Sequence, residues 1–204
     1  MDFINLANQP MLVVVGSWQA ETFSRPFINN HLFENNLAIV DDIGPTPIPG
    51  ISLAFGTTDF RIQVQQDRLC FFVLTYSGNI KTDICFYAAK ILQLLPFTPV
   101  KAFGINYKFK LAGITSSIFR SYLEFVSSVN NDGYTLQGAT TQVSLTKNNY
   151  ALNISAQAIG PEIIADINID YQVSDITTVL ALLSPEMMET HETEAKEFIS
   201  RWLS

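Results

Sequence analysis

Charged side chains are scarce in this sequence. Asp, Glu, Lys and Arg make up 15% of the 204 residues, against roughly 25% in a typical soluble protein. Only 12 residues are Lys or Arg and 19 are Asp or Glu, which gives a formal net charge of -7. Affinity for nucleic acid comes mainly from clustered Lys and Arg that neutralise phosphates, so we expect no nucleic-acid partner. With so few ions available, we expect something other than water to cover part of the surface.

Cysteines and long hydrophobic runs are also rare. Cys70 and Cys85 are the 2 cysteines; they are too few for a disulfide scaffold and are expected to be buried thiols. No apolar run reaches the roughly 18 residues that a membrane span needs. The first basic residue is Arg25, so no positively charged leader precedes the short apolar run at residues 11–15. We therefore expect a cytoplasmic protein with no membrane partner.

The familiar catalytic and cofactor-binding motifs are missing. The sequence contains no G-x-S-x-G elbow, Walker loop, G-x-G-x-x-G turn, H-E-x-x-H helix or C-x-x-C pair. Of the 2 histidines, His31 lies near a predicted helix end, and His191 lies on the apolar stripe of a predicted helix. Glu194 is the one neighbouring carboxylate spaced to share a helix face with His191. We therefore predict a packed or interfacial His191 rather than a metal ligand.

One segment resembles the start of a calcium-binding loop. Asp166, Asn168 and Asp170 follow the D-x-N-x-D pattern, but Tyr171 and Thr177 stand where such a loop requires Gly and Glu. The alternation of polar and apolar residues favours an extended strand here, with the three polar side chains on one solvated face. The sequence thus predicts no metal site and no cofactor.

Hydrophobic residues are abundant and periodic. They make up 48% of the chain, and aromatic residues 12%, which is enough for a sizeable core. Their spacing predicts an α+β protein of two similar halves, residues 1–98 and 99–204. The two halves are expected to pack intimately, either as two domains or as a single domain. Each half runs strand, helix, three strands, helix, with antiparallel sheets backed by helices, and strand 100–111 joins the halves. This repetition indicates an internal duplication.

The individual elements follow from period-two and helical patterns. The predicted strands are 11–15, 37–40, 51–55, 60–65, 69–76, 100–111, 139–146, 150–158 and 163–173. The predicted helices are 17–30, 80–95, 115–129 and two segments that begin at Asp175 and Ser184, and residues 44–50 are predicted to form a proline-rich loop.

Several segments resemble a known group of proteins. These are Asp67-Arg68-Leu69 ahead of a strand, the strand at residues 100–107, the segment at residues 166–170, and a last helix carrying His191 and Phe198. Over about residues 60–200, this order resembles a sporadically distributed family of uncharacterised prokaryotic proteins. The family has no established activity, so the resemblance implies a duplicated α+β fold and no catalytic residues.

The outward side of the predicted sheet carries mostly neutral polar side chains. Solvated strand faces more often carry Lys and Glu, whereas amides and hydroxyls cost less to desolvate and can pair across a contact. We therefore predict a non-catalytic binding or assembly module that forms a homo-oligomer, or binds another protein, through this face; an ordinary solvated face is the alternative. The candidate residues are Gln63, Gln65, Asn106, Thr140, Gln142, Ser144, Asn153, Ser155, Gln157, Asn168 and Gln172.

A second hypothesis is a small-molecule enzyme or a ligand-binding domain. Its pocket would lie between the sheet and the helices. The polar candidates for such a pocket are Tyr107, Asp166, Asp170 and His191.

Overall fold

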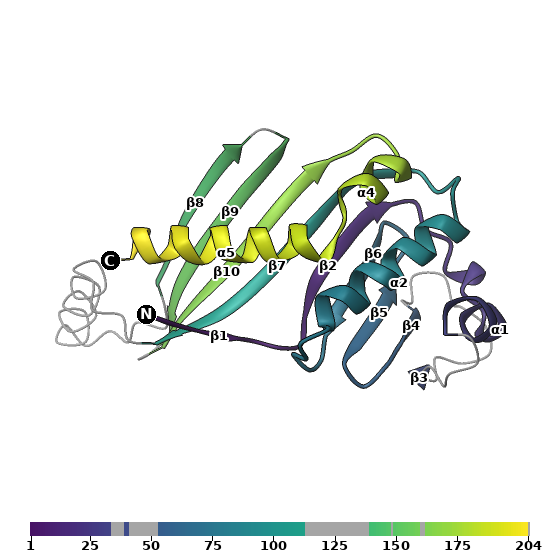
Figure 1. Cartoon of the computed structure of the whole chain (residues 1–204), viewed down its shortest axis with the longest axis horizontal. Helices are drawn as coiled ribbons and strands as arrows, with labels where there is room; N and C mark the ends of the chain where they lie inside the picture. Colours follow the sequence, from purple (N-terminus) through teal and green to yellow (C-terminus); the bar gives the residue numbers. More distant parts are fainter. Residues whose placement is uncertain (34–38, 41–52, 113–138, 148, 160–161, 204) are drawn as a thin grey trace.

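The computed structural model describes residues 1–33, 39–40, 53–112, 139–147, 149–159 and 162–203. Its strands form one antiparallel sheet in the order β3-β4-β5-β6-β2-β7-β10-β9-β8, and β1 pairs with β7 beside this path (Figure 1). The strands are β1 (Asp2–Asn5), β2 (Gln9–Gly16), β3 (Ile39–Val40), β4 (Leu53–Gly56), β5 (Phe60–Val64), β6 (Arg68–Val73), β7 (Val100–Ala112), β8 (Ala139–Lys147), β9 (Tyr150–Ile159) and β10 (Glu162–Gln172).

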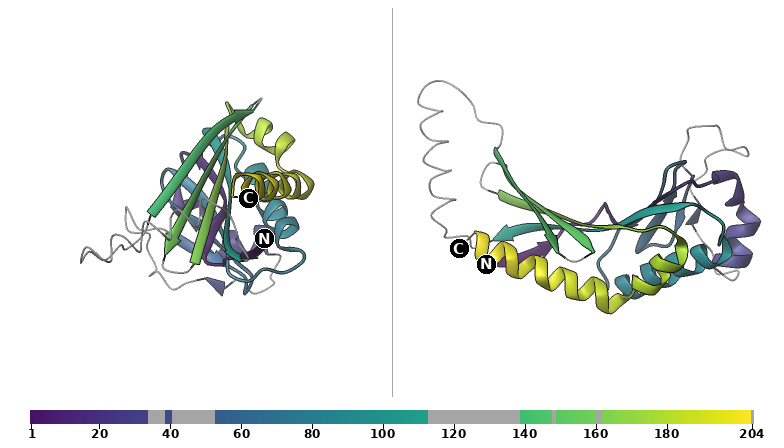
Figure 2. Two further views of the ribbon diagram at one scale, coloured as in Figure 1. Left: turned by 90° about the vertical axis from the view of Figure 1, so that its left-hand side faces the viewer. Right: turned by 90° about the horizontal axis from the view of Figure 1, so that it is seen from above.

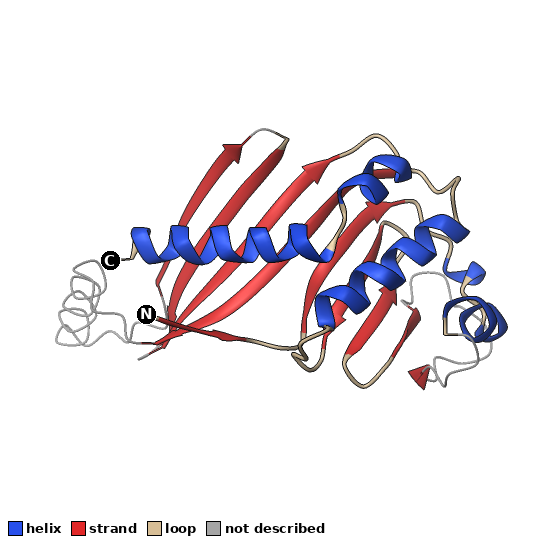
Figure 3. Ribbon diagram, in the orientation of Figure 1, coloured by secondary structure: helices blue, strands red, loops and turns tan. Residues whose placement is uncertain are grey.

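The helices of the described chain lie on one face of this sheet (Figure 3). Three of them are α2 (Ile80–Leu94), α4 (Ile176–Leu182) and α5 (Pro185–Trp202). Near the amino terminus, a 3-10 turn (η1, Ala20–Thr22) precedes a short helical segment made of α1 (Arg25–Phe27) and η2 (Ile28–Leu32). Among these described helices, none combines the length and the apolar character needed to cross a membrane.

The core lies between the sheet and these helices. Along β7, the side chains of Phe103, Ile105, Tyr107 and Phe109 are buried, and they alternate with residues that point to the opposite side. The matching positions of β10 are also apolar, since Ile105 pairs with Ile169 and Phe109 with Ala165. The period-two pattern of the sequence therefore determines which face of each strand packs against the helices.

Side-chain caps set the start of the last two helices. The Asp175 carboxylate accepts a hydrogen bond from the Thr178 backbone N–H at 2.8 Å, and the Ser184 hydroxyl accepts one from Met187 N–H at 3.1 Å. Pro185 occupies the first turn of α5, where its missing N–H costs nothing. Both predicted helix starts are confirmed.

The amino-terminal helix differs from the prediction. Ser17 does not cap it; instead Ser24 accepts a hydrogen bond from Phe27 N–H, and Pro26 lies in the first turn. The reason is that Pro tolerates a first turn but not a helix interior, so the helix begins just before Pro26. The strand predicted at 69–76 is also shorter, since β6 ends at Val73, and of the strand predicted at 51–55 only residues 53–55 are described, within β4 (Leu53–Gly56). The predicted helix 115–129 and the loop 44–50 lie outside the described residues.

The strands of both predicted halves belong to one continuous sheet. β7 connects them, because it pairs with β2 on one side and with β10 on the other. The joining role predicted for strand 100–111 is therefore seen in the register, and the α+β class is confirmed. The internal duplication stays a prediction.

Candidate binding face

The face of β7, β10, β9 and β8 that points away from the helices is called here the open face. The sheet curves towards the helices at its middle and away from them at both ends, so the open face is concave (Figure 2). Strand pairing aligns polar residues across it: Asn106 pairs with Asn168, Asn168 with Asn153, and Asn153 with Ser144. Eight of the predicted residues pair with one another across these four adjacent strands: Asn106, Thr140, Gln142, Ser144, Asn153, Ser155, Gln157 and Asn168.

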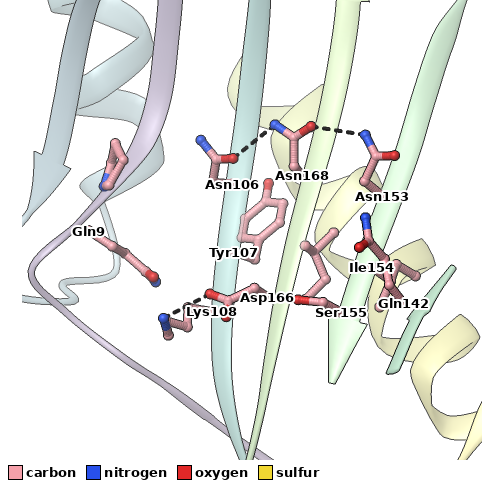
Figure 4. Close-up of a pocket in the computed structure, with 12 residues that line it drawn as sticks. Gln9, Asn106, Tyr107, Lys108, Gln142, Asn153, Ile154, Ser155, Asp166 and Asn168 are labelled. Carbon is pink, nitrogen blue, oxygen red and sulfur yellow. Dashed lines mark hydrogen bonds and ion pairs between the residues drawn. The ribbon is translucent and has the colours of Figure 1, made fainter. Parts of the chain in front are cut away.

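Three asparagines form a hydrogen-bonded row across the open face (Figure 4). Asn153 Nδ2 donates to Asn168 Oδ1 at 3.2 Å, and Asn168 Nδ2 donates to Asn106 Oδ1 at 3.0 Å. Because every amide is oriented the same way, the row presents an N–H₂ group at Asn106 and a carbonyl oxygen at Asn153. We name this arrangement the amide row.

Gly104 makes room for the amide row. A Cβ atom at this position would lie 3.1 Å from Asn168 Nδ2, closer than side chains normally approach. Any larger residue would push the central amide out of line with its neighbours. The glycine among the outward residues of β7 thus has a packing reason.

Two ion pairs join charged groups on the open face. Lys108 Nζ lies 3.0 Å from Asp166 Oδ1, and this pair is two register positions along from the Asn106–Asn168 pair. Further along the same two strands, Lys110 pairs with Glu162. Each pair joins one cation to one anion, so these ions leave the open face without a strong field of either sign.

A hollow of about 400 Å³ lies over the centre of the open face. Five strands surround it, β2, β7, β8, β9 and β10, and its rim combines neutral amides with the Lys108–Asp166 pair. The residues that line it are Gln9, Pro10, Asn106, Tyr107, Lys108, Gln142, Asn153, Ile154, Ser155, Asp166, Ile167 and Asn168.

Sequence reasoning missed some of this lining. Gln9 and Pro10 come from β2, which reaches the hollow only because the sheet places β2 next to β7. Such long-range neighbours leave no local signal in the sequence. Lys108 was visible as an outward residue of its strand, but its pairing with Asp166 depends on the register between β7 and β10.

Three predicted face residues lie away from the amide row. Gln172 ends β10, where its Nε2 donates to Asp170 Oδ2 at 2.9 Å. Gln63 lies in β5, separated from β7 by β6 and β2. Gln65 follows β5 in the turn to β6, where its backbone N–H bonds Arg68 O. Gln63 and Gln172 still point to the same side of the sheet as the amide row, but they lie at a distance from it, because the predicted alternation gives the face of a strand and not its place in the sheet.

The second hypothesis placed four polar groups in one pocket, but their side chains lie on two sides of the sheet. Tyr107 and His191 lie on the helix-covered side; the Tyr107 hydroxyl donates to Met188 O in α5 at 2.5 Å. Asp166 belongs to the open face, and Asp170 has the same parity on β10. Successive strand residues point to opposite faces. The sheet therefore lies between the side chains of Tyr107 and His191 on one side and the carboxylates of Asp166 and Asp170 on the other.

His191 is buried in a polar cluster beneath the sheet. Its Nε2 lies 2.5 Å from the Tyr171 hydroxyl, and its Nδ1 lies 3.5 Å from Glu194 Oε2. Burial lowers the pKa of His191, which favours the neutral ring, and burial raises the pKa of Tyr171 to about 12. A neutral His191 that accepts from Tyr171 carries its proton on Nδ1, facing Glu194.

Glu194 ties this cluster to the sheet edge. Its carboxylate accepts hydrogen bonds from the Tyr150 hydroxyl at 2.7 Å and from Lys147 Nζ at 2.5 Å. Burial acts to raise the pKa of Glu194, but these donors outweigh it and the pKa is lowered. The predicted packed role of His191 agrees with its burial.

Both cysteines are buried thiols. Burial raises the pKa of Cys70 to about 11 and that of Cys85 to about 12, so both thiols stay protonated and unreactive. Cys85 Sγ lies 3.3 Å from Met188 Sδ in the core. In the part of the chain that the structure describes, no group of three or more His, Cys, Asp or Glu side chains is arranged to hold a metal ion.

The fold and this surface define an α+β protein with one helix-covered and one open, neutral polar sheet face. A scan against protein-family models finds no match, and neither the curated proteins nor the solved structures contain a significant match to the chain. The resemblance to the uncharacterised prokaryotic family stays a prediction.

Proposed function

We propose that this chain is a non-catalytic binding or assembly module that holds a protein partner on its open face. The amide row is the observation that carries the proposal. It sets neutral donors and acceptors in a fixed line across three strands. Neutral amides lose less than ions when water is removed, and they regain hydrogen bonds in the contact.

The shape of the open face favours one kind of partner. Two concave surfaces meet only along their rims, so this face fits a convex element, such as a helix or a protruding loop, better than the same face of a second copy. The paired ions Lys108 and Asp166 fit a partner with little net charge, because neither sign dominates at the hollow.

Site-specific photo-crosslinking tests this proposal. A benzoylphenylalanine placed at Ser155 or Gln142, both at the hollow, is expected to yield the same adduct in cells that naturally produce the chain. The matched control is Thr193, an exposed residue of α5 on the opposite side. A second substitution, Asn168→Lys, should abolish the adduct because it breaks the amide row.

Equal crosslinking from Thr193 and from the open face would contradict the proposal. So would adducts that persist unchanged in the Asn168→Lys background, since the partner would then not depend on the row.

The hollow supports a second candidate function, binding of a small polar molecule. Its volume of about 400 Å³ falls in the usual range of ligand pockets, roughly 300–1,000 Å³. Native mass spectrometry of the purified chain checks this, because a retained ligand adds a defined mass. Asn168→Leu should remove that mass while leaving the fold intact.

A further inference from the structure

Strand β8 forms one edge of the sheet. Within the described residues it pairs only with β9, and the strand order ends there. An edge strand presents a row of backbone N–H and C=O groups that another strand can pair with. β8 spans nine residues, Ala139–Lys147, which is long for an edge.

Natural edge strands usually carry features that prevent such pairing, and β8 has few of them. Charged residues, prolines, bulges or a very short length are the common devices. The β8 sequence is ATTQVSLTK, with no proline and with a single charge at its last position. That charge, Lys147, is already neutralised by Glu194 of the same chain. Its Thr and Val residues also favour extended structure.

The helix-side residues of β8 leave apolar surface uncovered. Leu145 is 38% exposed although it pairs with the buried Leu152. Val143 is half-buried, and Thr141 is exposed. If another strand paired with β8, its helix-side residues would cover these three side chains.

The β8 sequence is complementary to itself in antiparallel orientation. Consider two copies of β8 related by a two-fold axis that passes next to Val143, perpendicular to the sheet. Val143 then faces Val143 of the second copy, and Leu145 faces Thr141 of the second copy. On the open face, Gln142 meets Ser144, and Thr140 meets Thr146. These pairs join neutral side chains on the same face, the terminal pair places Lys147 opposite Ala139, and the helices of both copies stay on one side.

We propose that two copies of this chain pair along β8 to form a two-fold dimer with one continuous sheet. This contact uses the strand edge and does not require a partner on the open face, so it goes beyond the proposed function. The net charge of -7 per chain opposes association, but β8 itself contributes no negative charge. A single paired edge is a small interface, so a reversible dimer of roughly micromolar affinity is expected.

The dimer would also join the two open faces. Because the axis is perpendicular to the sheet, both concave surfaces face the same way and meet at the β8 edges. A partner element held on one open face could then continue onto the next.

Disulfide trapping tests the register. Val143→Cys should give a covalent dimer under mild oxidation, because facing residues of paired strands have Cβ atoms about 4.5–5.5 Å apart. Thr141→Cys is the matched control. In the proposed register, the two copies of residue 141 are offset by four residues along the strands, about 13 Å, which is too far for a disulfide. The native cysteines Cys70 and Cys85 are buried and should not crosslink.

Sedimentation velocity over a concentration series measures the association itself. Val143→Lys places two like charges opposite each other and should weaken dimerisation at least tenfold, whereas Ser155→Lys, on the open face of the neighbouring strand, should leave it nearly unchanged. Circular dichroism checks that both variants fold, and trapping through Val143→Cys remains informative if Val143→Lys does not.

Three results would overturn this inference. The first is a wild-type chain that stays monomeric at all concentrations. The second is loss of association in Ser155→Lys but not in Val143→Lys, because the copies would then meet through the open face. The third is trapping by Thr141→Cys as efficient as by Val143→Cys, because the register would then be wrong.

Discussion

His191 combines burial with a proton-dependent environment. The residue is 5% exposed, and its Nε2 lies 2.5 Å from the Tyr171 hydroxyl. Burial lowers its pKa in the folded chain below the ordinary value of 6.5, while Glu194 acts in the opposite direction and is weaker. Protonation of His191 is therefore easier in the unfolded chain than in the folded one.

This difference predicts a pH-dependent stability. Above pH 6.5, the stabilisation from a neutral His191 is fully present, and it is lost as the pH falls below 6.5 towards the folded-state pKa, because the unfolded chain then binds the proton more readily. His191→Gln keeps an acceptor for Tyr171 but cannot titrate. We expect its free energy of unfolding, measured by urea titration, to depend less on pH between about pH 5 and 7.

The acidic residues of the same helix act in another pH range. The pKa values of Glu192 and Glu194 are lowered from 4.5, so their contributions are lost only as the pH falls below 4.5. A His191→Gln variant with the same pH dependence as wild type between pH 5 and 7 would mean that His191 is not the responsible group.

Residue patterns also contained the information that separates Tyr107 from Asp166. Tyr107 alternates in phase with Phe103 and Ile105, whereas Asp166 alternates in phase with Asn168. Period two alone therefore assigns them to opposite faces. The pocket hypothesis grouped them by chemical type and ignored this phase.

At the scale of elements, caps and periodicity predicted most of what the structure describes. The strands β7, β9 and β10 and the helices α2, α4 and α5 all begin within a few residues of their expected positions. There were two exceptions: β1 was not predicted, and the helix near Pro26 was predicted to begin too early, because the proline could be read either as a kink or as a first turn. Only the local hydrogen bond from Phe27 to Ser24 decides between them.

The start of α5 offers a direct test of one such cap. Ser184→Ala removes the hydroxyl that accepts from Met187 N–H and should lower the free energy of unfolding by about 1 kcal/mol. Ser184→Asp, another good cap, should restore most of that loss. Urea titration measures all three chains.

Thr193→Ala is the matched control for this cap. Its hydroxyl bonds Glu189 O within the helix, and Ala has the higher helix propensity, so no loss is expected. If Ser184→Ala and Thr193→Ala behave alike, the cap contributes nothing to the stability of α5.

At the scale of the whole molecule, strand order was the part that sequence could not supply. The neighbours β6-β2-β7-β10 come from distant parts of the chain, and each strand has the same alternating pattern. The amide row could be predicted as a set of outward amides, but not as a row, because the pairing of Asn106, Asn168 and Asn153 depends on two registers.

The single sheet makes a prediction about the two proposed halves. Ile105 of β7 is fully buried, and it pairs with Leu12 of the first half and Ile169 of the second. Ile105→Ala leaves a cavity in contact with both and should lower stability by about 2–5 kcal/mol. Since β7 connects the halves, this loss should affect the whole described sheet at once.

The 2 tryptophans allow each half to be observed separately. Trp18 is buried beside β2, with its Nε1 donating to Val14 O at 3.1 Å, and Trp202 ends α5. In Trp202→Phe and Trp18→Phe chains, the remaining fluorescence should show the same urea midpoint, and Ile105→Ala should lower both midpoints equally. Two separate midpoints, or a shift in only one, would mean that residues 1–98 and 99–204 unfold as independent units despite their shared sheet.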